Sequence, residues 1–163
     1  TITEPLPMLA NAVKTDATCF AANDGKITVS GQANGSGVYE YSVDGINWTG
    51  NPVLTGFSPG NYILQMRDAK AITCIITVGT LTITEPNKLN ATATAKHVTC
   101  FEGADGQIII TNEQGGSGTY EYSVDGINWS SGKVDNLSAN TYSLQMRDAI
   151  VKSKTSSSCK NKG

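Results

Sequence analysis

Histidine and charged residues are scarce in this sequence. A single histidine, His97, occurs among 163 residues, and Asp, Glu, Lys and Arg together make up 16% of the chain. Catalysis by a nucleophile that a histidine activates would therefore have one base at most, and we expect His97 to be a solvated residue near the start of a strand. The formal net charge of −2 provides no basic surface for nucleic acid. These scarcities predict that the chain is not an enzyme and binds no nucleic acid.

Long apolar runs and helical periodicity are also missing. No stretch approaches the roughly 18 consecutive apolar residues that span a membrane, so we expect no membrane insertion. The chain instead contains 17 glycines and many Ser, Thr and Asn residues, which are typical of turns between strands. This composition predicts an all-β protein.

The chain is an internal duplication. TITEP occurs at residues 1–5 and 82–86, and YEYSVDGINW occurs at 39–48 and 120–129, both at an offset of 81 residues. We therefore expect residues 1–5 to be the end of a preceding repeat, 6–86 to be repeat 1, and 87–163 to be repeat 2, with a divergent or truncated tail at 150–163. Pro86 stiffens a short joint between the repeats. A chain that begins with TITEP is expected to be part of a longer array.

Short apolar runs between Gly, Asn, Asp and Pro predict the strands of each repeat. In repeat 1 they are 9–15, 26–31, 38–43, 46–49, 61–67 and 72–84, the last of them bent at Gly79. About six strands in some 80 residues predict two tandem immunoglobulin-like β-sandwiches. Tyr62, Leu64 and Met66 should face the core, and Tyr62 stands where a tyrosine corner would stabilise the turn before its strand.

The repeated segment YEYSVDGINW permits more than one interpretation. Asp44-Gly45 predicts a two-residue hairpin turn. This turn would pair Tyr41 with Trp48 and place the bulky side chains on one face (Tyr39, Tyr41, Val43, Ile46 and Trp48). That face is predicted to be core, because burying each such side chain stabilises the fold by about 1.5–3 kcal/mol. A sugar-binding platform and a half-buried rim position for Trp48 are the alternatives.

The four cysteines are distributed two per repeat, far from any zinc-binding spacing. One cysteine near the start and one near the end of each repeat favour one disulfide per repeat, Cys19–Cys74 and Cys100–Cys159. Each bond would stabilise its repeat by roughly 4 kcal/mol and would imply an oxidising compartment. Leu64 stands two residues after Tyr62, where immunoglobulin domains carry a cysteine, so the expected pair differs from theirs.

Metal ligands are not densely spaced in the sequence. The aspartates that could gather around calcium stand mostly in Asp-Gly turns (Asp24, Asp44, Asp68, Asp105, Asp125 and Asp148). Calcium requires six to eight oxygen ligands, and no loop shows alternating acidic residues. We therefore expect no cofactor and no metal, with structural calcium as the weaker alternative.

Several motifs in fixed order resemble the SprB repeat. They are Thr-Cys-Phe followed by Asp-Gly (residues 18–25), Tyr-Glu-Tyr-Ser after a glycine-rich turn (37–42), Pro-Gly-Asn-Tyr (59–62), Arg-Asp-Ala before a cysteine (67–74), and the closing TITEP (82–86). The resemblance covers nearly all of repeat 1 and extends to Ala149 in repeat 2. In repeat 2 the closing segment is missing.

The resemblance implies a non-catalytic structural repeat of a giant adhesin on the surface of gliding Bacteroidetes, exported by type IX secretion. Expected partners are extracellular polysaccharide or other surfaces, neighbouring repeats, and copies of the chain in fibres. A carbohydrate-binding module is the alternative function, with Trp48, Trp129, Asn47 and Asn128 as candidate glycan contacts. A third hypothesis is an accessory array on a secreted hydrolase.

Overall fold

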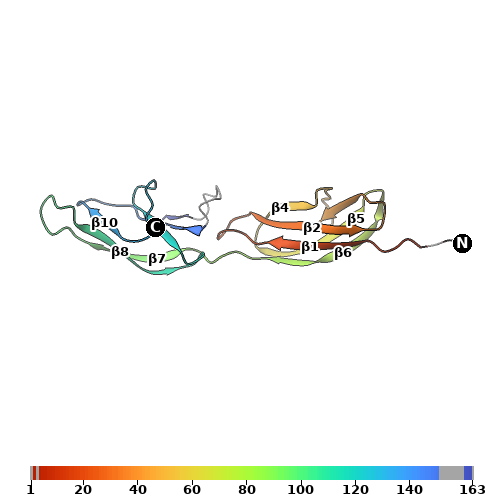
Figure 1. Ribbon diagram of the computed structural model, residues 1–163, viewed down its shortest axis with the longest axis horizontal. Coiled ribbons are helices and arrows are strands. Elements are labelled where there is room, and N and C mark those ends of the chain that lie inside the picture. The colour runs from red at the N-terminus through yellow and green to blue at the C-terminus, as the bar shows by residue number, and fades with distance from the viewer. Residues whose placement is uncertain (1, 3, 151–159, 163) are drawn as a thin grey trace. The chain divides into compact units, whose positions relative to one another are not determined.

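The protein divides into two compact units. The computed structural model describes residues 2, 4–150 and 160–162 (Figure 1). Unit 1 comprises Thr1–Ala17 and Ala21–Glu85, and unit 2 comprises Thr18–Phe20 and Pro86–Gly163.

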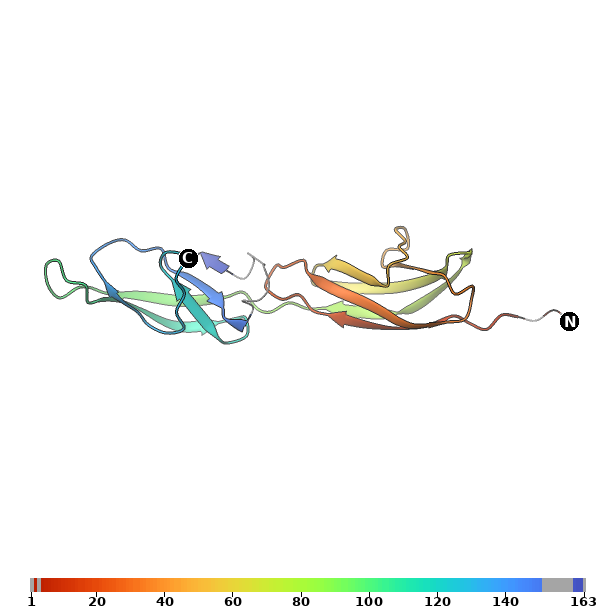
Figure 2. The same ribbon diagram turned by 45° about the horizontal axis from the view of Figure 1, so that its top comes forward.

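Unit 1 is a sandwich of two three-stranded antiparallel sheets. One sheet has the order β1-β2-β4, formed by Leu9–Thr15, Gly25–Ala33 and Val53–Phe57. The other has the order β3-β5-β6, formed by Tyr39–Ser42, Gly60–Asp68 and Ala71–Ile83. Figure 2 shows the strands of both sheets running lengthwise through the unit.

This strand order confirms the predicted immunoglobulin-like sandwich. The six strands can be lettered in chain order as in an immunoglobulin domain, with the short strand D left out. The two sheets then have the orders A-B-E and C-F-G, which is the immunoglobulin arrangement. The sequence missed β4, because Val53–Phe57 contains a glycine and lies among turn residues. No helix long and apolar enough to cross a membrane occurs in the described residues.

The core lies between the two sheets and follows strand alternation. In β5, Leu64 and Met66 are fully buried and Tyr62 packs against the core, whereas Ile63 points outward and is exposed. Ile27 and Val29 of β2 face them from the other sheet, and Ile83 closes the end of the core. The predicted inward face of 62, 64 and 66 is therefore confirmed.

The predicted tyrosine corner is present in both units. The Tyr62 hydroxyl donates to the carbonyl oxygen of Ser58 at 2.9 Å, and the Tyr142 hydroxyl donates to that of Ser138 at 3.0 Å. This bond spans the turn that precedes the strand. Its role is to hold that turn against the sandwich.

Unit 2 repeats the architecture of unit 1. Its first sheet has the order β7-β8-β10, formed by Asn90–Lys96, Gly106–Gln114 and Val134–Leu137. Its second sheet consists of β9, β11 and β12, formed by Tyr120–Ser123, Gln145–Asp148 and Lys160–Lys162. Tyr122, Val134, Met146 and Leu89 form its core.

The two-residue hairpin predicted at Asp44-Gly45 is wrong. Tyr41 pairs with Thr49 rather than with Trp48, through two backbone hydrogen bonds of 2.8 and 3.0 Å. A shift of one residue turns every following side chain to the opposite face of a sheet. Tyr41 is therefore buried as expected, but Ile46 is 81% exposed and Trp48 lies outside the core.

The two disulfides predicted within the repeats are also wrong. Cys74 and Cys100 carry free, exposed thiols, so neither Cys19–Cys74 nor Cys100–Cys159 forms, and Cys159 itself lies outside the described residues. The sequence reasoning took nearness to the two ends of a repeat as nearness in space. In a sandwich whose last strand runs its full length, those two positions lie far apart.

Gly25 at the start of β2 provides a test of the close packing at the end of the core. A Cβ there would lie 2.8 Å from Ile83 Cγ2 and 2.8 Å from the Phe57 carbonyl oxygen. Gly25→Ala should therefore lower the free energy of unfolding of unit 1 by about 1–3 kcal/mol, as overpacking does. Urea denaturation measures this change.

Gly79→Ala is the matched control in the same unit. A Cβ at Gly79 meets no atom within 4 Å. The control should be neutral or slightly stabilising, because alanine loses less backbone entropy than glycine when a strand forms. Equal losses of stability in the two variants would contradict the proposed packing constraint.

Candidate functional site

A cluster of three side chains stands on the outer face of the second sheet in each unit. In unit 1 it consists of Glu40 on β3, Arg67 on β5 and Trp48 in the loop after β3. In unit 2 it consists of Glu121, Arg147 and Trp129. We refer to these three side chains as the outer-face cluster.

The arginine organises the cluster. Glu40 and Arg67 are cross-strand partners, and both Nε and Nη2 of Arg67 donate to Glu40 Oε2 at 2.7 Å. The guanidinium carbon also lies 4.3 Å from the centre of the Trp48 ring, a cation–π arrangement. The corresponding distance to Trp129 in unit 2 is 4.2 Å. One guanidinium therefore satisfies a carboxylate and covers part of an indole.

An aspartate shapes the loop that carries the tryptophan. Asp44 Oδ1 accepts hydrogen bonds from the backbone N–H groups of Ile46 and Asn47 and from the Ser42 hydroxyl, and Asp44 Oδ2 accepts one from the Asn47 side chain. These donors, the Asn47 side chain first, hold the pKa of Asp44 well below its ordinary range. Gly45 supplies the positive φ of 71° that the loop requires.

Asp125 performs the same role in unit 2. Its carboxylate accepts hydrogen bonds from the backbone N–H groups of Ile127 and Asn128 and from the Asn128 side chain, which together lower its pKa. The Asp-Gly pair is therefore turn chemistry, as expected, although the turn belongs to a longer loop than the sequence predicted.

The candidate glycan contacts already have partners within the protein. The Trp48 indole N–H donates to the Gly45 carbonyl at 3.2 Å, and Arg67 stacks on the ring, which is half-buried. The Asn47 side-chain NH₂ donates to Asp44. Trp129 and Asn128 make the corresponding bonds in unit 2. The cluster thus stabilises its own loop, while Asn47 and Asn128 remain exposed.

A second carboxylate joins a loop to the end of β5. Asp68 is 4% exposed and accepts hydrogen bonds from the Ser36 hydroxyl and backbone N–H at 2.6 Å and from the Lys70 N–H at 2.8 Å. These bonds, that of the Ser36 hydroxyl first, lower the pKa of Asp68. A Cβ at Gly35 would lie 2.7 Å from Asp68 Oδ2, so only glycine fits beside this carboxylate. Asp148 holds Ser117 in the same way in unit 2.

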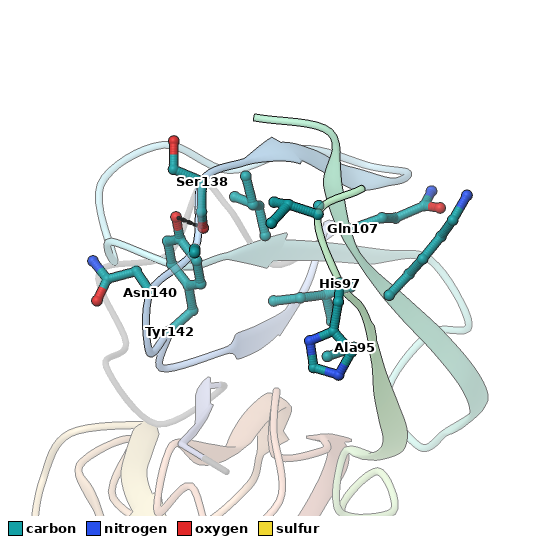
Figure 3. A pocket seen from close by; sticks show the side chains of 12 residues that line it. Ala95, His97, Gln107, Ser138, Asn140 and Tyr142 are labelled. Atoms are coloured by element: carbon teal, nitrogen blue, oxygen red, sulfur yellow. Dashed lines mark hydrogen bonds between the residues drawn. The ribbon is translucent and has the colours of Figure 1, made fainter. Parts of the chain in front are cut away.

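A hollow of about 280 Å³ opens at one end of unit 2, beside the tyrosine corner (Figure 3). Its wall includes His97, Gln107, Asn140 and Tyr142, and His97 is exposed, as expected. In unit 1 the same place is filled by Ile83, which contacts Gly25. The hollow is therefore at the position that the end of the last strand, β6, occupies in unit 1.

Strand register relates β12 to the last strand of unit 1. β12 ends with Lys162 opposite Gln145, and the equivalent pair in unit 1 is Thr77 with Gln65. The described part of unit 2 thus contains no residue in register with Ile83. The single histidine lines this hollow, and no nucleophile with a hydrogen bond to it is present among the described residues.

Metal binding finds no support in the described residues. They contain no group of three His, Cys, Asp or Glu side chains that could hold an ion. Asp105, one of the aspartates named as calcium candidates, accepts hydrogen bonds from the hydroxyl and N–H of Thr99. These bonds, the hydroxyl first, lower its pKa.

Sequence reasoning missed Arg67 and Arg147 as members of the cluster. Both occur in the repeated segment LQMRDA, which was the available signal. Their role depends on the register of Thr49 opposite Tyr41, which brings the tryptophan to the arginine's face of the sheet. No local pattern distinguishes that register from the two-residue hairpin.

The fold and these clusters define the protein as a tandem array of immunoglobulin-like sandwiches whose repeated polar groups stabilise loops. The SprB repeat family model matches the chain twice, at residues 11–47 and 92–128, and the chain thus carries two SprB repeats. No curated protein and no solved structure matches the chain. The family is one of structural repeats rather than of enzymes, and the resemblance inferred from the sequence is confirmed.

The lowered aspartate pKa values predict acid-labile loops. Asp68 has a folded-state pKa below its ordinary value of 3.8, so its stabilising effect is complete above that value and is lost as pH falls through the folded-state pKa. Urea midpoints should be constant between about pH 7 and pH 5 and should fall below about pH 4.

Asp68→Asn removes this titrating group and should make the fall in the urea midpoint less steep. Asp135→Asn is the control, since Asp135 is exposed and its side chain bonds only to the neighbouring Asn136 among the described contacts. An unchanged slope in Asp68→Asn would contradict the assignment.

Proposed function

We propose that the two units are non-catalytic structural repeats of a secreted cell-surface adhesin or filament that serves surface attachment and gliding motility. The presence of two SprB repeats supports this proposal, because the family suggests a cell-surface adhesin repeat. Export by type IX secretion and an extracellular location form part of the same proposal. The duplicated carboxylate and tyrosine anchors suit a unit whose task is to keep its shape.

The geometry of unit 1 suits a mechanical role. The Ala17 N–H donates to the Thr84 carbonyl at 2.9 Å, and the Thr84 N–H donates to Asp16 Oδ1 at 2.7 Å, so β1 and β6 end at the same end of the unit. Both strands therefore run in the same direction. The chain enters at the start of β1 and leaves at the end of β6, at opposite ends of the sandwich (Figure 2).

A pull on the two ends of the unit is consequently directed along its strands. Such a force loads the ladder hydrogen bonds of β1 with β2 and of β6 with β5 together, in shear, instead of opening them one at a time. Shear raises the barrier to forced unfolding, which is the quantity that governs mechanical lifetime. This arrangement is the observation that carries the proposed function.

A carbohydrate-binding module is the second candidate function. The occurrence of a half-buried surface tryptophan at the same place in both units favours it. Against it, a sugar would have to stack on an indole on which an arginine is already stacked.

Titration of the tryptophan fluorescence with soluble polysaccharides distinguishes the two candidate functions. A structural repeat predicts no change, and Trp48→Phe should behave as the parent does. A saturable shift that Trp48→Phe and Trp129→Phe together abolish would favour the module.

Force spectroscopy of the chain held by its two ends, under reducing conditions, tests the mechanical role. Asp16→Ala removes the acceptor of the Thr84 N–H and should lower the unfolding force of unit 1, with a several-fold faster unfolding rate extrapolated to zero force.

Lys14→Ala is the matched control, because it breaks the 2.7 Å Lys14–Asp16 ion pair and leaves the bond to Thr84 in place. The proposal would be contradicted by equal unfolding forces for Asp16→Ala and the parent. It would also be contradicted if the parent unfolded at a force as low as that of strands whose hydrogen bonds open one at a time.

A further inference from the structure

Unit 1 has four sheet edges, and three of them are protected from pairing with another strand. β3 has four residues, and its outer side is covered at Tyr41, whose backbone pairs with Thr49. β4 has five residues and directly follows Pro52. β1 has seven residues and carries Lys14, which forms an ion pair with Asp16. Short strands, charges and proline are the features that keep an edge from pairing with other chains.

The fourth edge, β6, is long and uncharged. It is the longest strand of unit 1, with 13 residues from Ala71 to Ile83 (Figure 1). Nine of these 13 residues are Val, Ile or Thr, and no charged residue or proline occurs from Ala71 to Thr84. Such a sequence has high β propensity, and no like charges would repel an identical strand. Of the four described edges, β6 is therefore the one that lacks these protections.

The first half of β6 is its exposed half. Every residue of Ala71–Thr77 except Ile76 is exposed. The second half is less exposed and leads to Thr84, whose carbonyl accepts a hydrogen bond from the Ala17 N–H beyond the end of β1. An approaching strand therefore has access to the first half.

The backbone of this half also lacks ladder partners. Ala71 lies opposite Asp68 and Ile75 lies opposite Arg67, so residues 72–74 have no partner on β5. Backbone N–H and C=O groups are strong hydrogen-bonding groups, and those at an edge are left to water or to an added strand. An antiparallel strand would give them the same kind of partners that they have inside a sheet.

Apolar surface surrounds the exposed half. A hollow of about 700 Å³ lies between residues 4–8 and the first half of β6, with Cys74 and Ile75 in its wall. Leu6, which also lines the hollow, is 72% exposed, and Ile72 on the neighbouring strand is 58% exposed. Contiguous exposed apolar surface of this kind is typical of a protein–protein contact.

We propose that unit 1 pairs with unit 1 of a second copy of the chain through the first half of β6. The two Ala71–Thr77 segments run antiparallel about a two-fold axis at Cys74, so that the sheets of the two copies join into one. In this register Thr73 of one copy lies opposite Ile75 of the other, and β-branched side chains pair across the contact. Pairing of one surface with itself closes the contact, so association stops at a dimer.

This pairing gives the expected association of copies a defined surface. It uses residues of unit 1 alone and does not depend on the attachment function. Its failure would consequently leave the proposed adhesin repeat as it stands.

Sedimentation equilibrium of the full chain tests the pairing. Cys74→Ser/Cys100→Ser serves as the parent, because it removes the two free thiols of the described residues and with them disulfide-linked dimers. We expect this parent to show a reversible monomer–dimer equilibrium. Thr73→Lys in the same background places like charges in the contact and should raise the Kd of the dimer about tenfold.

Thr80→Lys is the matched control, since Thr80 is an exposed threonine of the same strand outside Ala71–Thr77. It should leave the Kd unchanged, and both lysine variants should keep the urea midpoint of the parent. A parent that stays monomeric, equal effects of the two lysines on the Kd, or species larger than a dimer would overturn the proposal.

Cross-linking and hydrogen exchange examine the register of the contact. In Cys100→Ser, Cys74 carries the one free thiol of the described residues, and a short bis-maleimide should link two copies through it. After trypsin digestion the link should join peptide 71–88 to a second peptide 71–88. Amide exchange in residues 71–77 should slow as the protein concentration rises, while exchange in β2 should not change. Absence of this link, or exchange in 71–77 that is independent of concentration, would contradict the pairing.

Discussion

The course of the last strand is the constraint on which the rest of each repeat depends. In unit 1, β6 runs the full length of the sandwich and ends beside the end of β1, where Ala17 and Thr84 share a backbone hydrogen bond. The chain therefore enters at one end and leaves at the other. Ile83, near the end of β6, closes the core against Gly25, and the corresponding place in unit 2 is an open hollow lined by His97. The same course separates Cys19 from Cys74 in repeat 1.

Carboxylates perform the second task, which is to hold loops to strands. Asp44 accepts several hydrogen bonds from its own loop, and Asp68 accepts them from Ser36 and Lys70. Their counterparts Asp125 and Asp148 repeat these bonds in unit 2. Charge-assisted bonds of this kind compensate for the small core that a sandwich of some 80 residues can bury. Among the described residues, no three His, Cys, Asp or Glu side chains form a group that could hold an ion. The polar groups that stand out in the sequence are anchors of the fold.

Much of the fold could be predicted from the sequence, and the candidate site could be predicted only in part. Strand positions followed from alternation: the expected strand at 9–15 coincides with β1, and the tyrosine corner at Tyr62 was identified from its place after a Ser-Pro-Gly turn. The position of Trp48 could not be predicted, because Tyr41 opposite Thr49 and Tyr41 opposite Trp48 are equally compatible with the local pattern. A difference of one residue placed the indole on the outer face, against Arg67. The cysteine pairing failed for a related reason, since sequence separation does not indicate distance along a sandwich.

Periodicity and repetition are properties of the sequence alone, and they determined the all-β class, the duplication and the family, because strands require alternation and a repeated unit requires repeated letters. Tertiary structure decided which face each loop residue occupies and which end of unit 1 Cys19 and Cys74 occupy. Those outcomes depend on strand pairing across the sheet and on the direction of the last strand. Both are set by contacts between residues distant in the chain, such as Thr84 with Asp16 and Ala17, which no local pattern encodes.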